Sequence, residues 1–193
     1  NERCIAELKK RLPEYFAFDN AVSDTDSYIA THSVLGMELA ERERVKTLNT
    51  LASRFNTVLY TRSDTGALEG VLTRGGVLTH TEMPKIFNLS RINLNITIRP
   101  IETGLPLRIF DIMGCKGFVL SNYQDEIGSL FNIGEDIEVY SDYEELVSKC
   151  AYYLEHEDER KRIAENGYKK VSENYTYENR IMTMFNVILG DGE

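Results

Sequence analysis

The stretch Arg91–Gln124, RINLNITIRPIETGLPLRIFDIMGCKGFVLSNYQ, decides the fold of this chain. Apolar and polar residues alternate over 92–98, which predicts a strand. Residues 105–115 carry apolar side chains at helical spacing, and residues 117–121 form a nearly continuous apolar run that is typical of a central parallel strand. A loop with Pro100 and Gly104 separates the first strand from the helix. The segment therefore predicts strand, loop, helix and buried strand, the repeating unit of a parallel α/β sheet.

Strands and helices continue to alternate on both sides of this stretch. The other expected strands are 57–61, 77–79 and 138–140. The other expected helices are 2–12, 27–55, 82–88, 126–131, 142–156, 157–174 and 177–189. Each crossover is long enough for a right-handed parallel connection. We expect an α/β fold: a Rossmann-like three-layer α/β/α domain with a parallel sheet and extra helices at both ends.

Composition narrows the class of protein. The chain has 193 residues, 42% of them hydrophobic, and a net charge of −9, which is typical of a globular protein and argues against nonspecific binding to nucleic acid or anionic membranes. No apolar run is long enough to span a bilayer, and no signal peptide opens the sequence. The three cysteines lie far apart and are odd in number, which favours a reducing, cytoplasmic location.

The length suits one domain. We expect a helical lead-in over 1–40, a Rossmann-like core over 41–175 and a terminal helix over 176–193. The first residue is Asn and the sequence enters directly into helix-like material. We therefore expect a piece of a longer polypeptide.

A phosphate and ribose site is expected where the 92–98 strand meets the following helix. Gly104 lets backbone amides approach an anion at the helix amino end. Arg108, in the first turn, is unfavourable for the helix dipole by a few tenths of a kcal/mol to about one, so a bound diphosphate explains it better than local stability. Asp111 follows on the same face, where its carboxylate can accept ribose hydroxyls. The alternative is a plain Arg108–Asp111 surface ion pair, which is worth little.

Other candidates follow neighbouring strands. Arg62 comes after the first strand and could reach a phosphate, or could be a solvated turn residue. His80 follows the second expected strand and could contact a nucleobase, or could be structural. Glu126 either stabilises its own helix end or binds a sugar hydroxyl. The sequence holds no catalytic triad, no Walker or GxGxxG motif and no metal-ligand spacing, so we expect no metal.

Three motifs carry a family resemblance. They are GLPLRIFDIMGCKGF at 104–118, YYLEHEDERKRIAENGYKKV at 152–171 and NYTYENR at 174–180. With the surrounding residues they resemble the carboxy-terminal domain of GT-B-fold glycosyltransferases, nearest to the spore-maturation-type branch of the group 1 enzymes. The resemblance covers most of the chain, from about 44 to 180.

The resemblance implies half of a GT-B fold. In that family the carboxy-terminal domain binds a nucleoside-diphosphate sugar, while an amino-terminal domain, missing here, binds much of the acceptor and usually contributes a catalytic group. Asp111 would stand in place of a ribose-binding glutamate, Arg108 would lie beside the diphosphate, and the loop from Arg99 to Gly104 would contact sugar and phosphate. Related enzymes often carry two glutamates at a fixed spacing; here Glu102 and Asp111 stand slightly further apart.

The implied reaction is displacement of a nucleoside diphosphate by an acceptor hydroxyl. The donor is a substrate and no cofactor is expected; the catalytic residues are unknown. The fragment should bind donor weakly and transfer no sugar alone. Two other readings stay open: a non-catalytic nucleotide-sugar-binding or interaction module, and a sugar-nucleotide epimerase of GT-B fold.

Overall fold

A computed structural model describes residues 2–16, 28–98 and 103–190. The chain divides into two compact units. The first comprises Asn1–Thr57, Gly66–Val71 and Ile98–Glu102, and the second comprises Val58–Thr65, Leu72–Thr97 and Thr103–Glu193.

The first unit is helical. Its elements are α1 (Glu2–Arg11), the 3₁₀ turn η1 (Pro13–Phe16), the π-helix η2 (Ile29–Gly36) and α3 (Met37–Ala52). The helix expected at 2–12 is confirmed over Glu2–Arg11, and the helical stretch expected at 27–55 is confirmed over 29–52, where η2 runs into α3 without a break in helical backbone. The Asn49 side chain fastens α3 to the segment 66–71: its amide donates to the Ala67 carbonyl at 3.1 Å and its oxygen accepts the Glu69 N–H at 2.9 Å.

The second unit holds the strands, and every strand pair is parallel, as the sequence predicts. One sheet pairs β1 (Val58–Tyr60) with β2 (Leu72–Arg74). The other has the order β3 (Asn93–Asn95), β4 (Val119–Asn122) and β5 (Glu138–Tyr140). The helices of this unit are α4 (Met83–Leu89), α5 (Leu107–Gly114), α6 (Ile127–Leu130), α7 (Tyr143–Glu155), α8 (Glu157–Asn174) and α9 (Tyr177–Leu189).

The strand expected at 77–79 is wrong. The second strand is Leu72–Arg74, and Gly75-Gly76 follow it instead of opening it. The sequence VLTRGGVLTH, residues 71–80, contains two nearly identical segments, so alternation alone cannot choose between them. Pairing chooses the first one, since Val58 lies opposite Leu72 and the Thr61 N–H reaches the Arg74 carbonyl at 3.0 Å.

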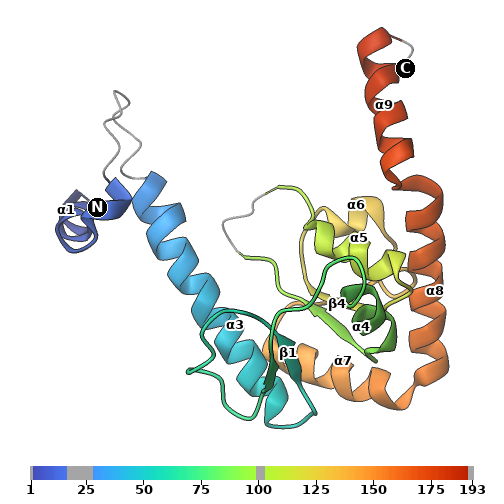
Figure 1. Ribbon diagram of the computed structural model, residues 1–193, viewed down its shortest axis with the longest axis horizontal. Helices are drawn as coiled ribbons and strands as arrows, with labels where there is room; N and C mark the ends of the chain where they lie inside the picture. Colours follow the sequence, from blue (N-terminus) through green and yellow to red (C-terminus); the bar gives the residue numbers. More distant parts are fainter. Residues whose placement is uncertain (1, 17–27, 99–102, 191–193) are drawn as a thin grey trace. The chain divides into compact units, whose positions relative to one another are not determined.

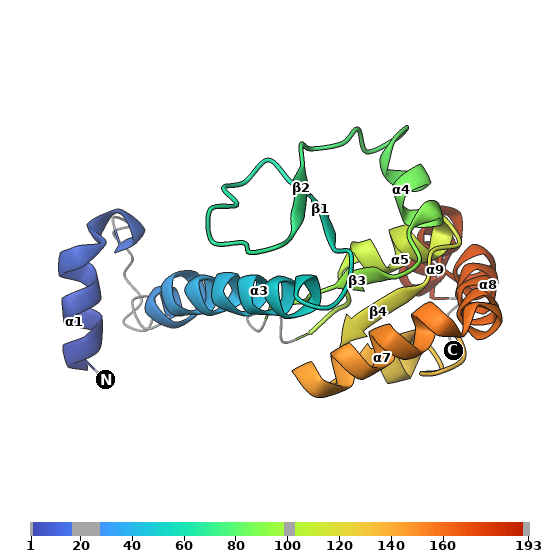
Figure 2. The same ribbon diagram turned by 90° about the horizontal axis from the view of Figure 1, so that it is seen from below.

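Both faces of β4 are covered, so that helix, sheet and helix form three layers. Val119, Leu120 and Ser121 are each no more than 2% exposed although successive strand residues point to opposite faces. Figure 2 shows α5 on one side of β4 and α7 on the other. Val119 belongs to the core cluster that also contains Ile109, Ile112 and Met113 of α5 and Val171 of α8.

Helix α8 lies unusually close to the loop 132–136. A Cβ built on Gly167 would stand 2.5 Å from the Asp136 carbonyl oxygen. The side-chain amide of Asn166 donates to the Glu135 carbonyl at 3.0 Å, and the Lys170 ammonium lies 2.8 Å from the Asp136 carboxylate. Glycine at 167 therefore allows a backbone contact that the two flanking side chains secure.

Helix α9 continues the chain beyond α8 (Figure 1) and buries none of its residues. Its apolar side chains, including Met184, Phe185 and Ile188, are more than half exposed. No helix in the described ranges combines the length and apolar character needed to cross a membrane.

Candidate functional site

The loops that follow β3 and β4 meet at the carboxyl edge of the three-stranded sheet, because neighbouring parallel strands end on the same side. The Glu126 carboxylate, at the end of the loop after β4, accepts a hydrogen bond from the Gly104 N–H, in the loop that leads to α5. Gly104 has a φ of 85°, a conformation that favours glycine, and a Cβ there would meet nothing within 4 Å. Two of the predicted site residues are thus brought together.

A second tie joins the same two loops closer to the sheet. The Asn122 side chain accepts the Thr97 N–H at 2.7 Å and donates to the Thr97 carbonyl at 3.1 Å. The Thr97 hydroxyl donates to the Gln124 side-chain oxygen at 2.8 Å and accepts from Asn95 at 3.0 Å. Thr97 is buried, so this network satisfies polar groups that would otherwise be costly.

Pro106 occupies the cap position of α5, and no side chain of the described residues caps the amino end of this helix. Amides of an uncapped first turn point outward with the positive end of the helix dipole behind them. Leu107, the first residue of the helix, is 70% exposed, so this end of α5 is open. The arrangement suits an anionic group.

Arg108 and Asp111 do not form the ion pair that was the alternative reading, as the ion pairs between described residues do not include them. The Arg108 guanidinium turns toward α4, where it donates to the Met83 sulfur at 2.9 Å and lies 5.5 Å from the centre of the Phe87 ring. Asp111 is exposed, and its charge adds to burial in raising the pKa of the Cys115 thiol. Both charged groups remain accessible to a ligand.

Met83 and Phe87 are residues that sequence reasoning did not single out for the site. Both are half-buried on α4, whose first turn also contains Pro84. In the sequence, the only feature that marks these two residues is the amphipathic pattern of the helix expected at 82–88. A contact between α4 and the first turn of α5 is not visible in that pattern.

Arg62 and His80 lie in the connections after β1 and β2, and both are exposed. Arg62 lies against Gly76, where a Cβ would come within 2.7 Å of the Arg62 Cγ. Beside His80, the Leu78 N–H donates to the Glu82 carboxylate at 2.7 Å. No hydrogen bond among the described residues links Arg62 or His80 to Arg108, Asp111 or Glu126. Arg99 lies outside the described residues.

Tyr123 is a further exposed side chain at the same edge. Its N–H donates to the Tyr140 carbonyl at 2.8 Å, which extends the β4–β5 pairing by one residue. A hydrogen bond to the Asp125 carboxylate raises the pKa of the Tyr123 hydroxyl. Asp125 therefore has its own partner within the loop and does not share the role of Glu126.

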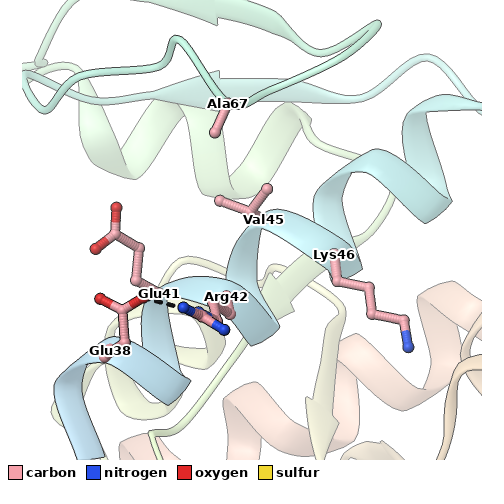
Figure 3. Close-up of a pocket in the computed structure, with 6 residues that line it drawn as sticks. All are labelled: Glu38, Glu41, Arg42, Val45, Lys46 and Ala67. Atoms are coloured by element: carbon pink, nitrogen blue, oxygen red, sulfur yellow. Dashed lines mark hydrogen bonds and ion pairs between the residues drawn. The ribbon is translucent and has the colours of Figure 1, made fainter. Parts of the chain in front are cut away.

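A separate shallow hollow of about 320 Å³ lies in the first unit, between α3 and Ala67 (Figure 3). Val45 points toward Ala67 across it, Lys46 points away, and the rim carries the Glu38–Arg42 ion pair at 2.7 Å. Its lining offers surface ion pairing and no nucleophile. Over the ranges that the structure describes, no three His, Cys, Asp or Glu side chains gather in a way that would hold a metal ion.

Comparison of the sequence with known proteins identifies the family to which the chain belongs. No curated protein matches the chain. Residues 42–186, well over half of the sequence, match the family described as glycosyl transferase-like, and they include α5, the β4–β5 pair and the helices α7 and α8. The chain therefore belongs to the glycosyl transferase-like family.

Proposed function

We propose that this chain is the donor-binding domain of a glycosyltransferase and binds a nucleoside-diphosphate sugar for transfer of the sugar to an acceptor hydroxyl. The observation that carries this proposal is the uncapped amino end of α5 at the carboxyl edge of parallel strands, with Gly104 before it and Arg108 in its first turn. Membership of the glycosyl transferase-like family supports it.

In this proposal the diphosphate lies against the first turn of α5 and the Arg108 guanidinium. Contact with Met83 and Phe87 leaves Arg108 exposed while restricting its long side chain, which lowers the entropy lost when a ligand binds. Asp111, one turn later, accepts the ribose hydroxyls. Arg62, His80, Arg99 and Gly104 remain proposed donor contacts, and Glu126 remains a proposed residue of the donor site.

The chemistry follows from the charge that develops on the leaving group. As the bond between sugar and diphosphate breaks, negative charge grows on the diphosphate oxygens, and fixed amides and a guanidinium stabilise it without reorganising. In this proposal an amino-terminal GT-B domain binds much of the acceptor and contributes a catalytic group. The isolated chain should therefore bind donor weakly and transfer no sugar.

We place this activity in the cytoplasm. The cysteines Cys4, Cys115 and Cys150 are all free thiols, which supports a reducing compartment.

Calorimetric titration with uridine diphosphate and guanosine diphosphate tests the proposal. One of them should bind, and Arg108→Ala should weaken it by about 10- to 100-fold, the value of a charge-assisted contact to phosphate. Arg42→Ala is the matched control, because Arg42 is an exposed arginine in the other unit that pairs with Glu38. Failure of every nucleoside diphosphate to bind would favour the non-catalytic module, and rapid sugar transfer by this chain would contradict the need for a second domain.

A further inference from the structure

The connection between β3 and α5 is anchored at both of its ends to one short neighbouring segment, Asn122–Glu126. At the strand end, Thr97 is held by the Asn122 and Gln124 side chains. At the helix end, the Gly104 N–H is held by the Glu126 carboxylate. The last residue of β4 and the four residues after it thus fix where the connection leaves the sheet and where it enters α5.

Ordinary local roles do not explain these side chains. Glu126 occupies the cap position of α6, yet it makes no capping bond to that helix and reaches the other loop instead. Asn122 uses both its donor and its acceptor on the backbone of Thr97, at 3.1 and 2.7 Å, and so extends the strand pairing with a side chain. Side chains that hydrogen-bond the backbone of a neighbouring loop in this way are suited to holding that loop in one conformation.

The anchored residues are those that the anion site depends on. Gly104 stands three residues before the first residue of α5, and its φ of 85° sets the direction in which the chain enters the helix. A shift of the loop would change the direction of the first-turn amides and the position of Arg108. An anion bound by several fixed donors loses affinity steeply when those donors move.

We propose that Asn122 and Glu126 are positioning residues of the donor site: they act through Thr97 and Gly104 to hold the amino end of α5 ready for a diphosphate. This inference rests on the proposed function. In it the Glu126 carboxylate contacts the protein backbone and not the sugar, which replaces the sugar-hydroxyl role considered from sequence.

Amide hydrogen exchange over residues 103–107 tests the positioning itself, with no ligand present. Glu126→Ala should raise the exchange rate of the Gly104 amide about tenfold, while Glu126→Gln, which keeps an acceptor oxygen, should restore most of the protection. Asp125→Ala is the matched control, since it removes a carboxylate from the same loop whose partner is Tyr123. Unchanged exchange in Glu126→Ala would overturn the proposal. Asn122→Ala should loosen the same segment from its other end.

Binding of uridine diphosphate, with and without an attached sugar, tests the consequence. Glu126→Ala should weaken both ligands about equally, by roughly tenfold, and Glu126→Gln should recover both. Loss confined to the sugar-bearing ligand would mean direct sugar contact, and tighter binding in both variants would mean that the carboxylate competes with the diphosphate; either result contradicts positioning. If the parent chain binds no nucleoside diphosphate, the proposed function fails, and the exchange experiment still decides whether Glu126 holds the loop.

Discussion

Gly167→Ala should destabilise the protein, although glycine-to-alanine changes inside helices usually stabilise. Gly167 is buried within α8, a helix of 18 residues. By helix propensity alone, alanine would gain about 1 kcal/mol. The new methyl group would, however, stand 2.5 Å from the Asp136 carbonyl oxygen, about 0.8 Å inside an ordinary carbon–oxygen contact.

The obstacle is backbone and cannot rotate away, so α8 or the loop 132–136 must move. Overpacking of this kind costs about 1–3 kcal/mol. The movement also stretches the Asn166–Glu135 hydrogen bond and the Lys170–Asp136 ion pair, which are 3.0 and 2.8 Å long and together worth about 1–2 kcal/mol. With the gain in propensity subtracted, the expected loss is about 2 kcal/mol, or roughly 4–8 °C in Tm for a chain of this size.

Urea unfolding followed by circular dichroism measures this loss, and Gly128→Ala is the matched control. Gly128 is also helical, but it is exposed and a Cβ there meets nothing within 4 Å, so alanine should be neutral or stabilising by up to about 1 kcal/mol. The two substitutions should therefore change stability with opposite signs. Equal stabilisation by both would refute the argument from the close backbone approach.

Three further outcomes follow from the structure. Burial raises the pKa of the Cys150 thiol to about 11, so at pH 8 it should react with a thiol reagent about 100-fold more slowly than free cysteine in solution. The difference should shrink as pH rises through 11, and equal rates measured by mass spectrometry would contradict this. Asp142→Ala should cost about 1 kcal/mol in urea unfolding, because the Asp142 carboxylate caps α7 through the Glu145 N–H at 2.8 Å, whereas Asp142→Asn should cost much less. Removal of residues 177–193 should change the Tm of the remaining chain by no more than about 2 °C, because α9 buries none of its residues. It should also raise solubility, because α9 exposes many apolar side chains. A large drop in Tm would show that α9 supports the core.

Elements with strong local signals could be predicted from the sequence. The bounds of β5, α8 and α9 match the expected 138–140, 157–174 and 177–189. Asp142 followed by Glu145 is a capping-box pattern, and in the structure the Asp142 carboxylate does accept the Glu145 N–H. Asn93 and Asn95, polar residues on a buried strand, had to be hydrogen-bonded, and they bond to carbonyl and hydroxyl oxygens at 2.9–3.2 Å.

Features that depend on which segments meet could not be predicted. The second strand was misplaced because VLTR and VLTH carry the same pattern and only pairing with β1 distinguishes them. The direction of Arg108 was missed for the same reason: a spacing of three residues places Asp111 nearby, but Met83 and Phe87 come from another helix. The Glu126–Gly104 bond joins loops 22 residues apart, and no periodicity encodes such a contact.

The strand order also has a consequence for how the chain folds. Asn95 pairs with Ser121, and Leu120 pairs with Glu138, so each ladder of the β3-β4-β5 sheet closes a long loop and none begins as a hairpin. The entropy cost of closing each loop must therefore be met before strand pairing can stabilise the sheet. Helix α5 lies inside the first loop and packs against β4, so this contact can offset part of that cost early in folding. We expect α5 and β4 to form the folding nucleus together, so that Ile112→Val slows refolding while substitutions in α9 leave the refolding rate unchanged.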